Sequence, residues 1–120
     1  MILVDTSVWV HHLRRGDATL TALLEGDSVA VHPFVIGELA CGSLRRPADL
    51  LRLLYALPSA STASHAEVMH FIAARRLGAC GVGYADAHLL ASASVDELRL
   101  WTRDKALARQ AKRLSIGFDA

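Results

Sequence analysis

A chain of 120 residues, 52% hydrophobic and 21% charged, is large enough to bury its own core, and we expect residues 1–120 to form one globular domain. No apolar run reaches the ~18 residues that a membrane span needs, and a strand-like segment stands where a signal peptide would begin, so we expect a soluble cytoplasmic protein with no membrane partner. Thirteen basic and twelve acidic residues give a net charge of +1, which over the whole surface argues weakly against a nucleic-acid partner.

The first seven residues contain the first strand and the first candidate site. Residues 2–4 are three large apolar residues in a row, which predicts a central strand buried on both faces, and the strand ends at Asp5. Ligands of open α/β sheets bind beyond the carboxyl ends of the strands, so Asp5 is placed at the functional edge. Capping of the next helix by Asp5 or Ser7 explains the same residues equally well.

Strand and helix signals then alternate along the chain, which is typical of a parallel sheet with helices on both faces. Proline and glycine mark the boundaries, with Pro33 at one helix start and Gly78 after another helix, and Ser64 with Glu67 forms a capping box. The predicted helices span residues 8–14, 18–25, 34–45, 47–57, 65–77, 84–95 and 104–114. The later predicted strands span residues 28–32, 59–62, 98–102 and 115–118, of which 59–62 is the weakest.

Two acidic residues occupy helix faces that should be apolar. Glu38 lies four residues after Phe34, and Asp86 lies four residues before Leu90, so we expect both carboxylates to point inward. A local ion pair explains Glu38 poorly, because the nearest basic residues are seven and eight positions away. Asp104 ends a strand as Asp5 does, although capping of the following helix is the stronger local explanation for Asp104.

If these four acids meet at one sheet edge, they need a counter-charge. Two carboxylates about 4 Å apart repel by roughly 4 kcal/mol at an effective dielectric constant of 20. Oxygen ligands with hydroxyls and water nearby suit Mg²⁺ or Mn²⁺. Zinc is disfavoured, because we expect the six scattered histidines to be surface or satisfied residues and Cys41 and Cys80 to be reduced core thiols.

Four short segments resemble, in order and spacing, the signature segments of PIN-domain proteins. They are Ile-Leu-Val-Asp-Thr-Ser at 2–7, Gly-Glu-Leu at 37–39, Tyr-Ala-Asp-Ala at 84–87 and Thr-Arg-Asp at 102–104. The chain length is most similar to that of the toxins of bacterial VapBC toxin–antitoxin pairs. The resemblance implies a PIN-like three-layer α/β/α sandwich with a parallel sheet of four or five strands in the order 3-2-1-4-5. It also implies a magnesium- or manganese-dependent endoribonuclease.

The resemblance makes the four acids a metal-binding and catalytic quartet, with Thr6 and Thr102 as supporting hydroxyls. Divalent ions can activate water and stabilise a charged phosphorane without a protein nucleophile. We assign Asp5 and Asp86 as the principal metal ligands and Glu38 as a ligand or water-orienting base. Asp104 becomes an outer or second-metal ligand, and Thr102 orients a bound water or a carboxylate.

RNA binding is compatible with the charge once these four acids are set aside, because eight acidic residues then remain against thirteen basic ones. The leading candidates for phosphate contact are Arg14, Arg15, Arg103 and Lys105. Further candidates are Arg45, Arg46, Arg109, Lys112 and Arg113, of which the last three also suit the end of a helix.

The resemblance further implies a homodimer and a cognate VapB-type antitoxin, whose C-terminal segment lies near the active site and can place a basic side chain in the acidic pocket. An apolar set is compatible with such a groove or with a dimer face, although core packing explains most of it: Leu44, Leu50, Leu51, Leu54 and Tyr55. We expect Trp9 and Trp101 to lie in the core.

Other classes share part of this pattern. A haloacid-dehalogenase-like phosphohydrolase needs a second Asp where this chain has Ser7. A receiver-like domain needs a phospho-acceptor at a mid-chain strand end, whereas Asp49 falls in a predicted helix. A non-catalytic PIN-like binding module would keep the fold and lose the metal, and the intact acids favour a nuclease over it.

Overall fold

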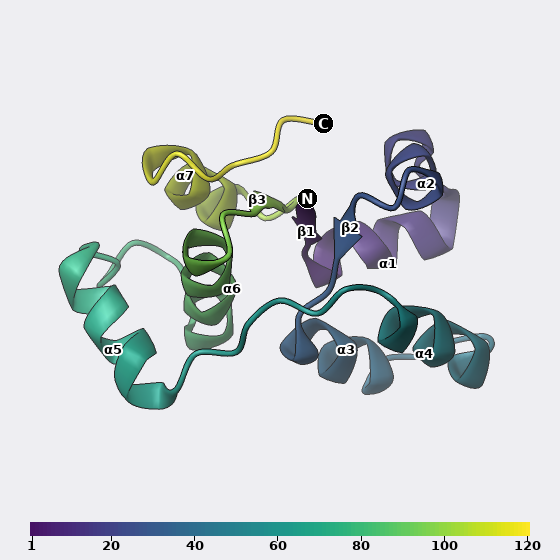
Figure 1. Ribbon diagram of the computed structural model, residues 1–120, viewed down its shortest axis with the longest axis horizontal. Helices are drawn as coiled ribbons and strands as arrows, with labels where there is room; N and C mark the ends of the chain where they lie inside the picture. The colour runs from purple at the N-terminus through teal and green to yellow at the C-terminus, as the bar shows by residue number, and fades with distance from the viewer.

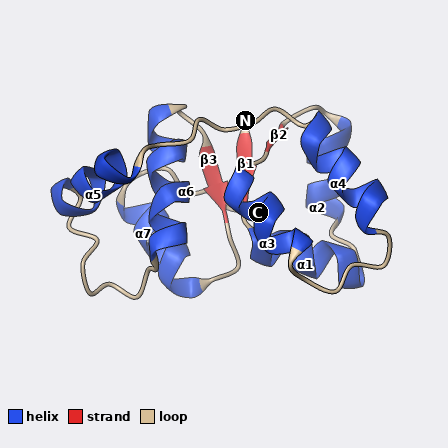
Figure 2. Ribbon diagram, turned by 90° about the horizontal axis from the view of Figure 1, so that it is seen from below, coloured by secondary structure: helices blue, strands red, loops and turns tan.

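The computed structural model describes residues 1–120 and shows a parallel sheet with helices on both sides (Figure 1). The strands are β1 (Ile2–Val4), β2 (Val29–Ala30) and β3 (Arg99–Trp101). The helices are α1 (Thr6–Arg15), α2 (Ala18–Glu25), α3 (Pro33–Ala40), α4 (Pro47–Ala56), α5 (His65–Ala74), α6 (Tyr84–Val95) and α7 (Lys105–Arg113). In Figure 2 the strands lie between α1–α4 on one side and α5–α7 on the other. The predicted α/β/α architecture is confirmed.

The central strand of the sheet is β1, which pairs in parallel with β2 and with β3. Single parallel bridges extend the sheet at both edges, from Val31 to Ser59 and from Leu100 to Gly117. With these edge segments included, the spatial order is the predicted 3-2-1-4-5. The sheet has three full strands where four or five were expected. The segments at 59–62 and 115–118 contribute one bridge each and no full strand.

The core forms around β1, as the apolar run at the start of the chain predicts. Leu3 and Val4 are fully buried, and Trp9 and Trp101 are 1% and 6% exposed. In the apolar set on and near α4, Leu54 is fully buried whereas Tyr55 is 73% exposed. Core packing therefore explains part of that set, and the dimer surface stays a prediction.

Three helix boundaries differ from the prediction by two residues or more. Helix α1 begins at Thr6, two residues early, because Asp5 takes the N-cap position. Helix α3 ends at Ala40 and not at residue 45, since the following segment must turn before Pro47, and proline disfavours helical backbone at the preceding residue. Helix α5 ends at Ala74 and not at residue 77.

The prediction that both cysteines lie in the core is wrong for Cys41, which is exposed beyond the end of α3, while Cys80 is half-buried. Both are free thiols. None of the helices combines the length and the apolar character needed to cross a membrane.

Candidate functional site

Asp5 follows β1 at the carboxyl edge of the sheet and is only 6% exposed. It occupies the N-cap position of α1, yet its carboxylate makes no capping hydrogen bond. The Oδ2 atom instead accepts hydrogen bonds from Ser7 Oγ at 2.8 Å and from Thr102 Oγ1 at 2.7 Å. The capping interpretation is therefore wrong for the Asp5 side chain, which two hydroxyls hold at the sheet edge.

The two hydroxyls tie the end of β1 to the end of β3. Ser7 Oγ and Thr102 Oγ1 are 3.3 Å apart. The backbone N–H of Arg103 donates to Ser7 Oγ at 2.9 Å, and that of Asp104 donates to Thr102 Oγ1 at 3.0 Å. Each hydroxyl thus donates to Asp5 and accepts from the backbone, which fixes its orientation. From the sequence alone, Ser7 was given no role beyond capping, and the Asp-x-Ser spacing was a signal only for its hydrogen bond to Asp5.

Glu38 lies on α3, and its Oε1 atom accepts a hydrogen bond from Thr6 Oγ1 at 2.8 Å. The prediction that Glu38 points inward is wrong, because its side chain is exposed. The buried face of α3 consists of Val35, Ile36 and Leu39, which leaves Glu38 at the margin beside α1. Thr6 connects this acid to the same end of β1 that carries Asp5.

Asp86 lies in the first turn of α6 and is half-buried. Burial raises the pKa of its carboxyl group, the negative charges of Asp5, Asp104 and Glu38 raise it further, and a backbone hydrogen bond from Gly83 offsets part of the rise. The charges of the three other predicted quartet members all act on Asp86. The structure thus brings the four acids into one electrostatic neighbourhood.

Asp104 caps α7, as its local sequence predicts, because Oδ1 accepts from the backbone N–H of Leu107 at 3.1 Å. Its Oδ2 atom takes no part in that contact, so capping and a role at the acidic site are compatible.

No protein cation neutralises the acids. The protein has a single ion pair, between Arg52 and Asp49 on α4, and neither residue belongs to the predicted quartet. No three Asp, Glu, His or Cys side chains lie close enough together in this arrangement to hold an ion. The donor set suits a hard divalent cation, and the charges of Asp5, Asp104 and Glu38 repel that of Asp86.

Two histidines depart from the prediction that all six are surface or satisfied residues. His32 is fully buried and His88 is 3% exposed, and one ring nitrogen of each lacks a partner. His32 Nδ1 caps α3 by accepting from the Phe34 backbone N–H at 3.0 Å. Burial, and secondarily the charge of His88, lowers the pKa of His32 to about 4. His32 is therefore a neutral structural residue beside the aromatic ring of Phe34.

The four leading candidates for phosphate contact, Arg14, Arg15, Arg103 and Lys105, are all exposed, and none forms an ion pair. Arg14 and Arg15 lie at the end of α1, and Arg103 and Lys105 lie around the start of α7.

The fold and the acidic edge together define a class. Residues 2–113 match the PIN domain family, and the chain belongs to that family. Within it, the chain is 50% identical over 108 residues to Ribonuclease VapC32 from two strains of Mycobacterium tuberculosis, a match that covers 89% of this chain and 87% of the relative. The chain is thus a VapC-type PIN domain.

Solved structures with the same fold have much lower identity. PAE2754 from Pyrobaculum aerophilum superposes with a TM-score of 0.68 at 20% identity, covering 98% of this chain and 87% of the other. A toxin-antitoxin complex from Klebsiella pneumoniae gives 0.69 at 21%, covering 90% and 91%. FitAcB from Neisseria gonorrhoeae gives 0.65 at 20%, covering 93% and 94%. At these identities the likeness supports the fold.

Proposed function

We propose that this protein is an endoribonuclease that acts as the toxin of a type II toxin–antitoxin system. One observation carries the chemistry: the charges of Asp5, Glu38 and Asp104 raise the pKa of Asp86, and no basic side chain is paired with any of the four. A purely structural cluster of acids would be expected to have such partners. The identity to a named ribonuclease along most of both chains supports the same activity.

The acids require a divalent cation, for which Mg²⁺ or Mn²⁺ is the best match to a set of carboxylate oxygens. Asp5 and Asp86 would be the principal ligands, Glu38 would be a ligand or orient the attacking water, and Asp104 would be an outer or second-metal ligand. When bound, the cation supplies the counter-charge and lowers the pKa of a water molecule. Because the carboxylates stand apart in the structure, we expect them to close on the ion as it binds.

The chain's own hydroxyls position the ligands. Ser7 and Thr102 both donate to Oδ2 of Asp5, which leaves Oδ1 free of these two contacts. Thr6 Oγ1 likewise donates a hydrogen bond to Oε1 of Glu38. The cleaved phosphodiester lies at the carboxyl edge of the sheet, among Asp5, Asp86 and Glu38, and no side chain becomes covalently bonded to the RNA.

Partners follow from the class. We propose that the 120-residue domain forms a homodimer in the cytoplasm and is held inactive by a cognate VapB-type antitoxin that places a basic side chain among the acids. A toxin-antitoxin complex from Klebsiella pneumoniae shares the fold, as does FitAcB from Neisseria gonorrhoeae. A non-catalytic binding module with the same fold is the alternative.

The decisive assay uses purified protein and labelled RNA, with Mg²⁺ or Mn²⁺ and with chelator. We expect internal cleavage with metal, and none with chelator or for Asp5→Asn and Asp86→Asn. Glu25→Gln, which changes an exposed carboxylate at the end of α2, is the matched control and should cleave like the wild type. Equal cleavage in chelator and in both site variants would refute the metal-nuclease proposal, and RNA binding without cleavage in any metal would favour the binding module.

A further inference from the structure

Two basic clefts adjoin the acidic site, and one site residue lines each of them. The α3–α4 cleft has a volume of about 1020 Å³ and contains Glu38 in its wall. Its basic and apolar walls come from Val10, Leu13, Arg14, Leu39, Leu44, Arg45, Arg46 and Leu50. The α7 cleft has a volume of about 680 Å³ and contains Thr102, and its basic walls come from Arg99, Lys105, Arg109 and Lys112.

The arginines of the α3–α4 cleft have no partner within the protein. Arg14, Arg45 and Arg46 make no ion pair and no side-chain hydrogen bond. The cleft contains one further acid, Asp49, and this side chain is 3.6 Å from Arg52. With Glu38 counted among the site acids, three guanidinium groups remain for a ligand. They stand beside apolar side chains, a combination that suits phosphates and bases of a single strand.

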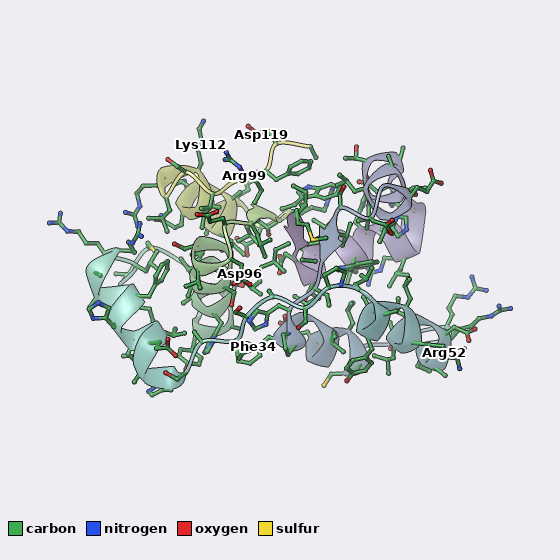
Figure 3. All side chains as sticks on the ribbon, viewed as in Figure 1. Phe34, Arg52, Asp96, Arg99, Lys112 and Asp119 are labelled. Atoms are coloured by element: carbon green, nitrogen blue, oxygen red, sulfur yellow. The ribbon has the colours of Figure 1, made fainter.

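The α7 cleft has four cationic side chains against one acid, Asp119. It begins at Thr102, whose hydroxyl is 2.7 Å from Asp5, and it continues along α7 past Lys105 and Arg109. Figure 3 shows Lys112, Arg99 and Asp119 on the side of the molecule away from Arg52. The α7 cleft thus lies on the opposite side of the molecule from Arg52 of α4, the helix that contributes Asp49 and Leu50 to the α3–α4 cleft.

The topology explains this placement. Glu38 lies on the helix that follows β2, Thr102 follows β3, and β1 with Asp5 lies between those strands. We propose that single-stranded RNA crosses the acidic site with its backbone in the α3–α4 cleft on one side of the cleaved bond and in the α7 cleft on the other. This inference rests on the proposed function, because an endonuclease must hold a chain that continues on both sides of the bond it cuts.

An acidic peptide is the rival occupant of the α3–α4 cleft. RNA is favoured because a second cationic cleft starts on the other side of the acids, and a polyanion that reaches both must pass the carboxylates where hydrolysis is proposed. Repeated phosphates match the four cations of the α7 cleft, and the salt dependence of RNA binding reports such contacts directly.

Binding is tested with the full-length protein carrying Asp86→Asn, which blocks cleavage, and a fluorescent single-stranded RNA. Arg45→Gln/Arg46→Gln and Lys105→Gln/Arg109→Gln should each weaken binding about tenfold or more and reduce the slope of log K against log salt by about 1.4. Arg75→Gln/Arg76→Gln, which removes two exposed charges beyond α5 and outside both clefts, should bind like the parent. Unchanged RNA binding in either cleft variant overturns the proposal. The proposal is also overturned if Arg45→Gln/Arg46→Gln loses binding to polyglutamate, the probe for an acidic peptide, but binds RNA like the parent.

A second experiment tests which cleft holds which side of the RNA. It uses protein that retains Asp86, and an RNA whose cleavage position has been mapped. On the intact RNA, each cleft variant should cleave more slowly than the parent. Once the nucleotides on one side of the cleavage position are removed, one cleft variant should cleave as fast as the parent. Removing the nucleotides on the other side should have the same result for the other cleft variant. If both variants respond to the same side, the proposed path is wrong while the nuclease stands. If the parent binds RNA through both clefts and never cleaves, the nuclease fails and the binding path stands.

Discussion

The acids that follow strands and the acids that lie on helices are held in different ways. Asp5 is buried and accepts two hydroxyl hydrogen bonds, and Asp104 caps α7 with one oxygen. Glu38 is exposed with a single hydroxyl partner, and Asp86 is half-buried with a pKa raised by burial and by the other three carboxylates.

This difference separates geometry from electrostatics. The strand-end acids are fixed by hydrogen bonds, from hydroxyls at Asp5 and from the backbone of α7 at Asp104. The helix acids lie on two other elements, and the charge of Asp86 is repelled by the other three carboxylates. A divalent cation should therefore change the helix side of the site most, and substitutions on the two sides should differ in their effects.

The largest effect is expected when a principal ligand loses its charge. Asp5→Asn and Asp86→Asn should each lower the cleavage rate by about 10²- to 10⁴-fold, the range found for removal of a central electrostatic or proton-transfer group. Their stabilities should diverge, because Asn at position 5 disturbs two partly buried hydrogen bonds and costs about 1–2 kcal/mol. Kinetics on labelled RNA and urea unfolding measure both. An Asp86→Asn protein with wild-type activity would contradict the assignment.

A smaller loss is expected for the strand-side hydroxyl. Thr102→Val removes a donor to Asp5 and an acceptor for the Asp104 N–H, and should lower activity about 10- to 100-fold with weaker metal affinity. Thr102→Ser keeps the hydroxyl and should restore most of both. If Ser and Val behave alike, Thr102 acts through packing and not through its contact with Asp5.

The sheet edge was predictable from sequence because its signals are local. An apolar run ending at Asp5 and the Thr-Arg-Asp segment place both strand-end acids, and the spacing of apolar residues gave the bounds of α2 and α6 correctly. The exposure of Glu38 was not predictable, because it depends on which side of α3 packs against α1. Spacing alone allowed either side.

Contacts between distant segments account for the remaining differences. Ser7 bonds to Thr102 and Arg103 only because β1 and β3 end side by side, and no local pattern shows that. In the sequence His32 resembles any other polar residue, because its burial depends on how α3 and α6 pack around its ring. The two basic clefts likewise combine side chains from separate elements, so sequence could name some of their cations but not group them.

The smallest effect concerns the buried imidazole that lies outside the acids. His32 has a pKa lowered to about 4 by burial, so the unfolded chain binds its proton first as pH falls below about 6.5. This contribution to stability is present above that pH and is lost toward pH 4, by at most about 2 kcal/mol between pH 7 and 5.

Urea unfolding at pH 7 and pH 5 measures this loss. The free energy of unfolding should depend less on pH for His32→Asn, in which the side chain can still cap α3. The pKa of His88 is also lowered, so part of the dependence should remain. An unchanged dependence in His32→Asn would show that other groups cause it.

Thermal unfolding of the wild type and of Asp86→Asn, each with chelator and with millimolar Mg²⁺ or Mn²⁺, tests the central claim most directly. Because the pKa of Asp86 is raised, its ionised carboxylate destabilises the metal-free fold at neutral pH, and Asp86→Asn should melt at a higher temperature than the wild type in chelator. Metal should then raise the melting temperature of the wild type, with little or no rise for Asp86→Asn. The account would be contradicted if neither ion changed the melting temperature of the wild type and if the wild type and Asp86→Asn had the same melting temperature.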